Sequence, residues 1–252
     1  MKTNIMILFT LIFSFNLISQ DAKTIVNRCT AALGGEEAVR RFSDYQAEGD
    51  VKFTMYSYEF PGKIDIIQKG RKSRTRFDLD FGGRSMTLIR AFDGKVAWQE
   101  SRGSVSDSPS LNDESNLAHT IAILLDKKAD FSIDKETEID GKKAIGIIAD
   151  VGGKKTVFFI DKKKHMLLEI LFKDTFFGDK DTKEVVERRI RYEDYREFDG
   201  FLFPMKTTIY QKGEKQSVYN FEKVTFNPRV SASLFKRPDK KPDLRYYEER
   251  ID

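Results

Sequence analysis

The most constraining feature of this sequence is a long region, from Tyr45 to Phe226, in which apolar and polar residues mostly alternate with a period of two. At its start Tyr45, Ala47, Val51 and Phe53 alternate with polar residues. A period of two places successive side chains on opposite faces of a strand. Each alternating segment therefore predicts a β-strand with one buried face, and the region as a whole predicts a large sheet.

Glycine-containing turn signals separate the alternating segments. They are Pro61-Gly62, Lys69-Gly70, Gly82-Gly83, Asp93-Gly94, Asp140-Gly141, Gly152-Gly153, Asp199-Gly200 and Lys212-Gly213. Asp-Gly between alternating segments is a strong signal for a tight hairpin, so neighbouring strands should be antiparallel. This spacing predicts roughly 11–12 strands. Pro204 lies inside one of them, which indicates a sheet edge or a bulge because proline cannot donate a ladder hydrogen bond.

Two segments have helical rather than strand periodicity. Residues 21–42 carry one apolar stripe, interrupted at Gly34-Gly35, which predicts a helix that ends and starts again. Residues 112–128 carry a second stripe, through Leu117, Ile121 and Leu124. Cys29 lies on the first stripe, and we expect it to be a small buried hydrophobic residue rather than a reactive thiol.

A sheet with one apolar face must bury that face against something. The expected fold class is mainly β with helices (α+β): a curved antiparallel half-barrel of roughly 11–12 strands covered by helices. Eight strands fill their own interior, whereas more strands leave room for a ligand. The 21 Phe residues could therefore line an apolar cavity or fill a solid core, and the periodicity alone leaves both open.

Composition excludes several kinds of chemistry. The 252 residues carry 44 Lys and Arg against 40 Asp and Glu, which argues against a nucleic-acid partner. One Cys and two His exclude a disulfide framework and a Cys/His zinc cluster. No nucleophile triad, Gly-rich phosphate loop or His-Glu motif is present, so we predict a protein without cofactor that is not an enzyme.

The first twenty residues resemble an export signal. Lys2 precedes an uncharged apolar segment, Ile5 to Ile18, which is shorter than the ~20 residues that a spanning helix needs. We expect residues 1–20 to be a cleaved signal peptide, with an uncleaved anchor as the alternative. The half-barrel domain would then cover residues 21–236, and residues 237–252 would form a charged tail.

Several short stretches carry a family resemblance. They are Ala32-Leu33-Gly34-Gly35-Glu36-Glu37-Ala38, Phe92-Asp93-Gly94-Lys95 with Trp98, Tyr195 with Asp199-Gly200-Phe201-Leu202-Phe203-Pro204, and Phe221 through Val224 to Asn227-Pro228 with Leu234-Phe235. In this order they resemble the LolA-like group of periplasmic outer-membrane lipoprotein-sorting proteins. The resemblance implies an incomplete antiparallel barrel closed by helices over an apolar cavity. No motif here matches the arginine that holds the lid of the dedicated carriers; Arg74, Arg76 and Arg90 are the candidates.

The resemblance implies a periplasmic carrier, expected to be a monomer, that shields the acyl chains of a lipid or lipoprotein and acts with envelope membrane proteins. An envelope-stress sensor with the same fold, acting on a protein partner, is the alternative. Helix 112–128 is the candidate movable lid, displaced when ligand enters. Strand and helix parity alone gives the candidate cavity residues Phe53, Met55, Ile66, Phe77, Leu79, Met86, Leu88, Trp98, Leu117, Ile121, Leu124, Leu168, Ile170, Phe172, Phe203 and Phe221.

Overall fold

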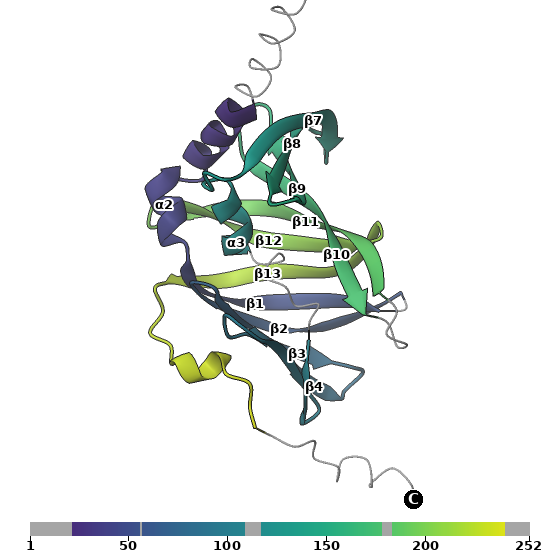
Figure 1. The fold of residues 1–252 in the computed structure, drawn as a ribbon. Helices are drawn as coiled ribbons and strands as arrows, with labels where there is room; N and C mark the ends of the chain where they lie inside the picture. Colours follow the sequence, from purple (N-terminus) through teal and green to yellow (C-terminus); the bar gives the residue numbers. More distant parts are fainter. Residues whose placement is uncertain (1–21, 56, 109–116, 178–182, 240–252) are drawn as a thin grey trace, which may run out of the picture.

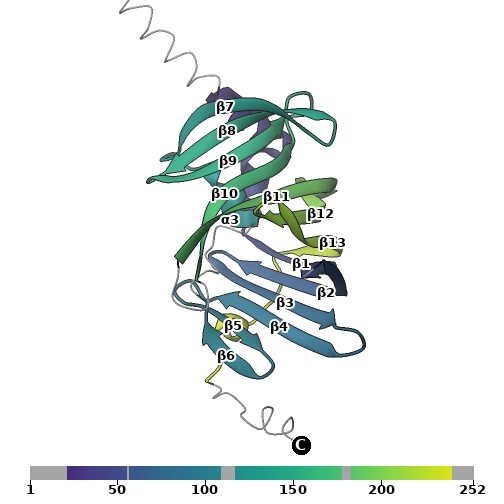
Figure 2. The same cartoon turned by 90° about the vertical axis from the view of Figure 1, so that its right-hand side faces the viewer.

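The protein is built around one antiparallel sheet (Figure 1). The computed structural model describes residues 22–55, 57–108, 117–177 and 183–239. Across these residues the sheet has 13 strands in the order β6-β5-β4-β3-β2-β1-β13-β12-β11-β10-β9-β8-β7. Strands β1 to β6 extend to one side, and β7 to β13 return so that the last strand pairs with the first. Figure 2 shows β7 at one end of this series and β6 at the other.

Most strands are long, and nearly all neighbours in the chain are neighbours in the sheet. Their bounds are β1 Asp44–Met55, β2 Tyr58–Lys69, β3 Lys72–Asp80, β4 Ser85–Phe92, β5 Ala97–Ser101, β6 Ser104–Asp107, β7 Asp130–Ile139, β8 Lys142–Val151, β9 Lys154–Asp161, β10 Leu167–Phe177, β11 Lys183–Phe198, β12 Phe201–Gln211 and β13 Glu214–Phe226. The predicted fold class is confirmed, but the predicted strand number was slightly too low. The short strand β6 accounts for this difference, because its 4 residues leave little periodicity to detect.

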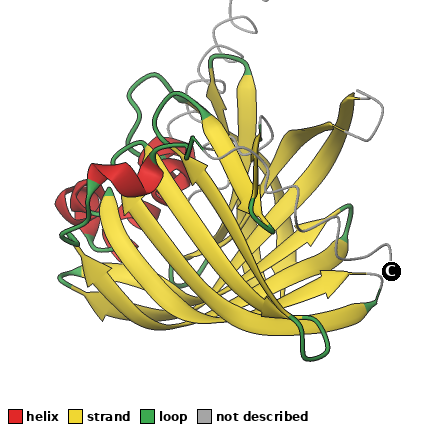
Figure 3. Cartoon of the chain, turned by 90° about the horizontal axis from the view of Figure 1, so that it is seen from below, coloured by secondary structure: helices red, strands yellow, loops and turns green. Residues whose placement is uncertain are grey.

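Helices cover one face of the sheet, called here the inner face. A helix at residues 22–32 and α2 (Gly35–Arg41) precede the sheet, and α3 (Leu117–Ile123) lies between its two halves. Their buried residues share one hydrophobic cluster with the inner-face residues of the strands. Figure 3 shows the sheet curling, with the helices gathered at one side of it. The described helices include none that is long and apolar enough to cross a membrane.

The predicted break between the first two helices is confirmed. Gly34 and Gly35 both have positive φ, 118° and 88°, which favour glycine. A Cβ on Gly34 would lie 1.9 Å from the carbonyl oxygen of Gly200, in the turn between β11 and β12. The Leu202 amide donates to the Leu33 carbonyl at 3.0 Å, so the helix pair is joined to the sheet at this point.

The second predicted helix is shorter than expected. Of residues 112–128, α3 comprises only Leu117–Ile123, and residues 112–116 lie outside the described part of the chain. The residues after Ile123 continue in turns, with the Leu125 amide donating to Ala122 and the Asp126 amide to Ile123. The apolar stripe of the predicted helix is nevertheless buried, because Ile121 and Leu124 are 1% and 5% exposed.

Pro204 lies in β12, where only one neighbouring strand is paired with it. It faces Tyr195 of β11, whereas the ladder between β12 and β13 begins only at Lys206. Pro204 therefore behaves as an edge residue although β12 is a central strand, which agrees with the prediction from its missing N–H.

Candidate functional site

A cavity opens in the inner face of the sheet. Its volume is about 140 Å³, room for roughly ten water molecules at ~10–15 Å³ each. Strands from both halves of the sheet form its walls, and α3 contributes Leu117. The lining residues are Tyr45, Ile66, Ser73, Thr75, Phe77, Arg90, Ala91, Phe92, Leu117, Arg188, Ile190, Tyr192, Phe203, Thr207, Ile209, Tyr219 and Phe221.

Aromatic rings fill the interior next to the cavity. Phe42 stacks on Phe201 with ring centroids 4.2 Å apart and on Tyr45 at 4.7 Å. Phe203 contacts Phe42 edge-on at 5.7 Å, and Phe226 does so at 5.8 Å. Such offset and edge-on pairs add to the stability gained from burial. The Phe-rich interior is thus a solid core at the end near α2 and has a cavity beside it. The two alternatives drawn from the sequence, a solid core and an apolar cavity, each describe part of it.

Two arginines project from the strands into this largely apolar interior. Arg188 on β11 forms an ion pair with Asp174 of β10, with Nη1 and Oδ2 3.1 Å apart, and both side chains are largely buried. Arg90 on β4 lies over the ring of Phe77, with its Cζ atom 5.9 Å from the ring centroid. The charge of Arg188 is therefore matched by a carboxylate, whereas that of Arg90 faces an aromatic ring.

The Arg90 side chain is half-buried, and its guanidinium lacks the carboxylate partner that Arg188 has. Its Nε atom is buried and has no hydrogen-bond partner, and no ion pair joins Arg90 to any of the described residues. Burial lowers its pKa, the Tyr219 hydroxyl raises it, and the positive charge of Arg188 lowers it again. Arginine nevertheless stays protonated in proteins. The cavity wall therefore carries a positive charge that nothing in the described chain neutralises.

Buried tyrosines complete the polar part of the wall. Burial raises the pKa of Tyr45 and Tyr192 and also that of Tyr219, so all three stay neutral and can donate hydrogen bonds. Among the described residues, no group of three or more His, Cys, Asp or Glu side chains is arranged to hold a metal ion. The site thus combines apolar walls, neutral hydroxyls and a fixed cation.

Five of the residues predicted from parity line the cavity. They are Ile66, Phe77, Leu117, Phe203 and Phe221. Eight more belong to the same inner hydrophobic cluster without lining the cavity: Phe53, Leu79, Met86, Leu88, Ile121, Leu124, Ile170 and Phe172. The side chain of Met55 lies outside the described part of the structure.

Two predicted cavity residues, Trp98 and Leu168, lie on the outer face instead. Trp98 packs with Ala91 and Val105 in a separate cluster, and its indole Nε1 donates to the Phe235 carbonyl at 2.9 Å. Phe235 belongs to η2 (Ala232–Phe235), the C-terminal turn that covers the outside of the sheet at this point. Because both faces are covered there, an apolar residue does not identify the inner face.

Leu168 is displaced by a bulge in β10. The register against β9 shifts between Leu167 and Glu169, so the alternation of side chains is broken there. Leu167 and Ile170 point into the inner cluster, whereas Leu168 packs in an outer cluster with Phe159. The prediction that Leu168 shares a face with Ile170 was therefore wrong.

Arg90 was one of the three candidates for a lid-holding arginine and Arg188 was not predicted, although the sequence indicates that both side chains point inward. Arg90 has the same parity as Met86 and Leu88, and Arg188 has that of Ile190 and Tyr192. A charged residue that continues an inward apolar parity must enter the interior. By contrast, Arg76 on β3 has the opposite parity to the inward residues Thr75 and Phe77 of that strand. It pairs with Asp78 at 2.9 Å on the outer face, as expected of a solvated surface.

The antiparallel sheet is open and curled, and together with the helices on its inner face it surrounds a cavity. This arrangement defines the class of LolA-like half-barrels. No protein-family model and no curated protein sequence matches this chain. Solved structures do share its fold. A domain assigned to outer-membrane lipoprotein sorting, from Vibrio parahaemolyticus, has a TM-score of 0.53 at 13% identity, over 86% of this chain and 97% of that one.

Two further structures match over similar lengths. A DUF1329 family protein from Desulfovibrio piger has a TM-score of 0.55 at 12% identity, over 87% of this chain and 97% of that one. A LolA superfamily protein from Nitrosomonas europaea has a TM-score of 0.52 at 11% identity, over 86% and 97%. These matches confirm the LolA-like resemblance at the level of the fold.

Proposed function

We propose that this protein is a lipid-binding carrier of the cell envelope that shields an acyl chain in its inner cavity, and that it is not an enzyme. The observation that carries the proposal is the cavity itself, which lies between apolar strand residues and an apolar helix. The fold it shares with a domain assigned to lipoprotein sorting supports the same function. We further propose that residues 1–20 direct export to the periplasm and that the carrier acts there as a monomer.

The size of the cavity sets the scale of the interaction. Room for about ten waters holds a similar number of methylene groups, which corresponds to one partly buried acyl chain. At ~0.8 kcal/mol for each buried methylene, ten give roughly 8 kcal/mol before costs. Ordering of the ligand and opening of the site oppose this gain, so the affinity should be moderate. A carrier must release its ligand, and a moderate affinity permits release.

Filling the cavity tests this function. Thr75 on β3 lines the cavity, and Thr225 on β13 is exposed on the opposite face. We expect Thr75→Phe to lower the affinity for laurate at least tenfold, because a ring takes the place of methylene groups worth more than ~1.4 kcal/mol. The control Thr225→Phe should bind as the wild type does. Displacement of the neutral fluorescent probe N-phenyl-1-naphthylamine measures both affinities.

Native mass spectrometry of protein purified from its own envelope gives a second measurement. Co-purified lipid, lost in Thr75→Phe and kept in Thr225→Phe, supports the carrier. A regulatory module that acts on a protein partner does not need acyl chains in this cavity. Clean ligand-free protein that also ignores laurate and the neutral probe would refute the carrier and favour that alternative.

A further inference from the structure

Arg90 is the feature of the cavity that shielding a hydrocarbon chain does not explain. A cation in an apolar interior is costly unless it is paired, and almost all buried polar groups have partners. Arg188 follows this rule through Asp174. The Nε atoms of both arginines are buried without a hydrogen-bond partner, but Arg90 has no ion pair with any described residue and lies instead over the face of Phe77. A purely hydrocarbon ligand would leave this charge as poorly solvated as before.

We propose that the ligand is a single-chain anionic amphiphile whose head group, a carboxylate or a phosphate monoester, binds Arg90 inside the cavity. This inference rests on the proposed function and narrows its ligand class. The planar guanidinium matches both head groups, because each offers two oxygens to its fork of N–H donors.

The surroundings of Arg90 fit such a head group. Thr75 is the cross-strand partner of Arg90 and lines the same cavity, so its hydroxyl is available beside the guanidinium. Tyr219 is close enough for its charge state to affect Arg90, and burial keeps this tyrosine neutral. Among the described residues no Asp or Glu lines the cavity, so an entering anion meets donors there.

The remaining lining defines where the chain lies. Apolar side chains of Ile66, Phe203, Ile209 and Phe221 form the walls of the same cavity. Its volume of about 140 Å³ accommodates one chain of about ten methylenes, and it is too small for several chains together. A medium-length acyl chain with one anionic end therefore satisfies both parts of the site.

The test compares ligands that differ only in the head group. Laurate, dodecyl phosphate and the neutral dodecanol each compete with N-phenyl-1-naphthylamine on the full-length mature chain. We expect the wild type to bind an anionic ligand at least ~10-fold more tightly than dodecanol, since hydrogen bonds to charged groups give differences of this size. Arg90→Gln should remove that preference and leave the affinity for dodecanol unchanged.

Arg74→Gln is the matched control. Arg74 lies on the neighbouring strand with opposite parity to Thr75, so the variant removes the same charge from the outer face. It should keep the preference for the anionic ligand. If laurate binds more tightly than dodecyl phosphate and this binding depends on Arg90, the head group is a carboxylate. The reverse order indicates a phosphate monoester.

Stability supplies a readout that separates a binding residue from a structural one. Removing an unpaired, half-buried charge relieves part of its desolvation cost, so Arg90→Gln should unfold at a higher urea concentration than the wild type. A lower midpoint would show that Arg90 supports the fold. Equal binding of anionic and neutral ligands, unchanged in Arg90→Gln, would overturn the head-group proposal and leave the acyl cavity standing. Failure of all three ligands and of the neutral probe would overturn both.

Discussion

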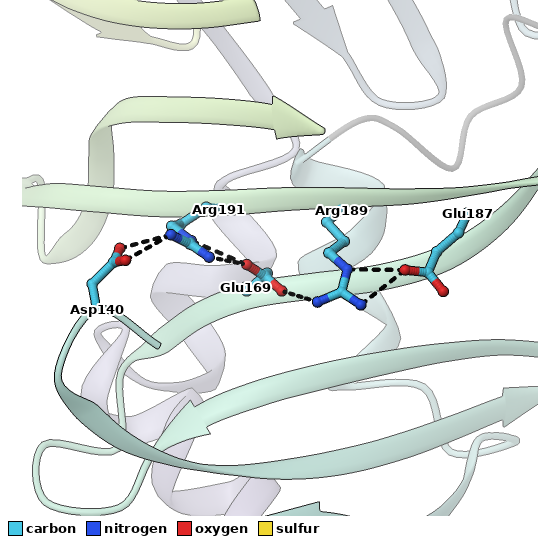
Figure 4. Close-up of polar contacts among 5 residues, drawn as sticks. All are labelled: Asp140, Glu169, Glu187, Arg189 and Arg191. Atoms are coloured by element: carbon cyan, nitrogen blue, oxygen red, sulfur yellow. Dashed lines mark hydrogen bonds and ion pairs between the residues drawn. The ribbon is translucent and has the colours of Figure 1, made fainter. Parts of the chain in front are cut away.

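Glu169 illustrates how the outer face of the sheet handles charge at the level of single residues. Its side chain is 2% exposed, yet it accepts hydrogen bonds from Arg191 at 2.9 and 3.0 Å and lies 3.7 Å from Arg189. Figure 4 shows the chain of contacts continuing to Asp140 and Glu187. These partners satisfy a buried carboxylate, which is the condition under which a charge can be buried.

Removing this carboxylate should therefore be costly. Glu169→Ala leaves Arg191 with the exposed carboxylate of Asp140 and the ring of Tyr210, and we expect a loss of about 3 kcal/mol of unfolding free energy. Urea denaturation followed by circular dichroism measures it. Glu187→Ala serves as the control, because its pair with Arg189 is exposed and should contribute under about 1 kcal/mol. Equal effects of the two variants would show that the burial of Glu169 does not matter.

At the level of elements, α3 is the part of the inner face that we propose can move. It has 7 residues, fewer than the ~12–15 that an isolated helix needs to be stable in water. Its order therefore depends on the packing of Ile121 and Leu124, while Leu117 lines the cavity. The lid hypothesis drawn from the sequence remains a proposal, now limited to this short helix.

Hydrogen exchange can test the lid. We expect the amides of α3 to exchange faster than those of β11 and β12 in the free protein, because local opening should cost the least there. Saturating laurate should slow exchange in α3, since a bound chain adds contacts to Leu117 once the helix has closed again. In Thr75→Phe the same laurate concentration should slow exchange less than in the wild type. Exchange in α3 as slow as in the central strands, with or without laurate, would refute the lid.

The elements show which parts of the fold the sequence could predict. Hairpins and the helix break at Gly34-Gly35 depend on neighbouring residues, so local patterns predicted them. The bulge beside Leu168 and the covering of Trp98 by η2 depend on contacts between distant residues, and no local pattern contains them. For the same reason parity predicted the inner cluster well but could not show which members line the cavity.

At the scale of the whole molecule, several buried acids make stability depend on alkaline pH. Burial raises the pKa of Cys29 from 9.0 to about 12, in agreement with its predicted role as an unreactive hydrophobic residue. Burial also raises the pKa of Tyr45, Tyr192 and Tyr195. Above about pH 9 the unfolded chain loses protons that the folded chain retains, so unfolding free energy should fall as the pH rises.

The unfolding free energy measured by urea denaturation at pH 8 and at pH 10.5 tests this dependence. Cys29 alone should contribute a loss of about 2 kcal/mol over this interval, because its folded form stays protonated. Cys29→Ala should reduce the loss by that amount, whatever its effect at pH 8. Stability that stays constant or rises up to pH 10.5 would contradict the assignment.

The sheet does not close on itself, and this has a consequence for how copies of the chain meet. In the described part of the chain β7 pairs with a strand on one side only, so a strand from a second molecule could add at its other edge and start a fibril. That edge carries four acidic residues, Asp130, Asp134, Glu136 and Glu138, against one basic residue, Lys135, and its register is interrupted between Ile133 and Glu136. The β7 edge of a second copy would bring like charges together and would meet an irregular hydrogen-bond register. The open sheet that leaves room for a ligand therefore also has an edge that discourages polymerisation.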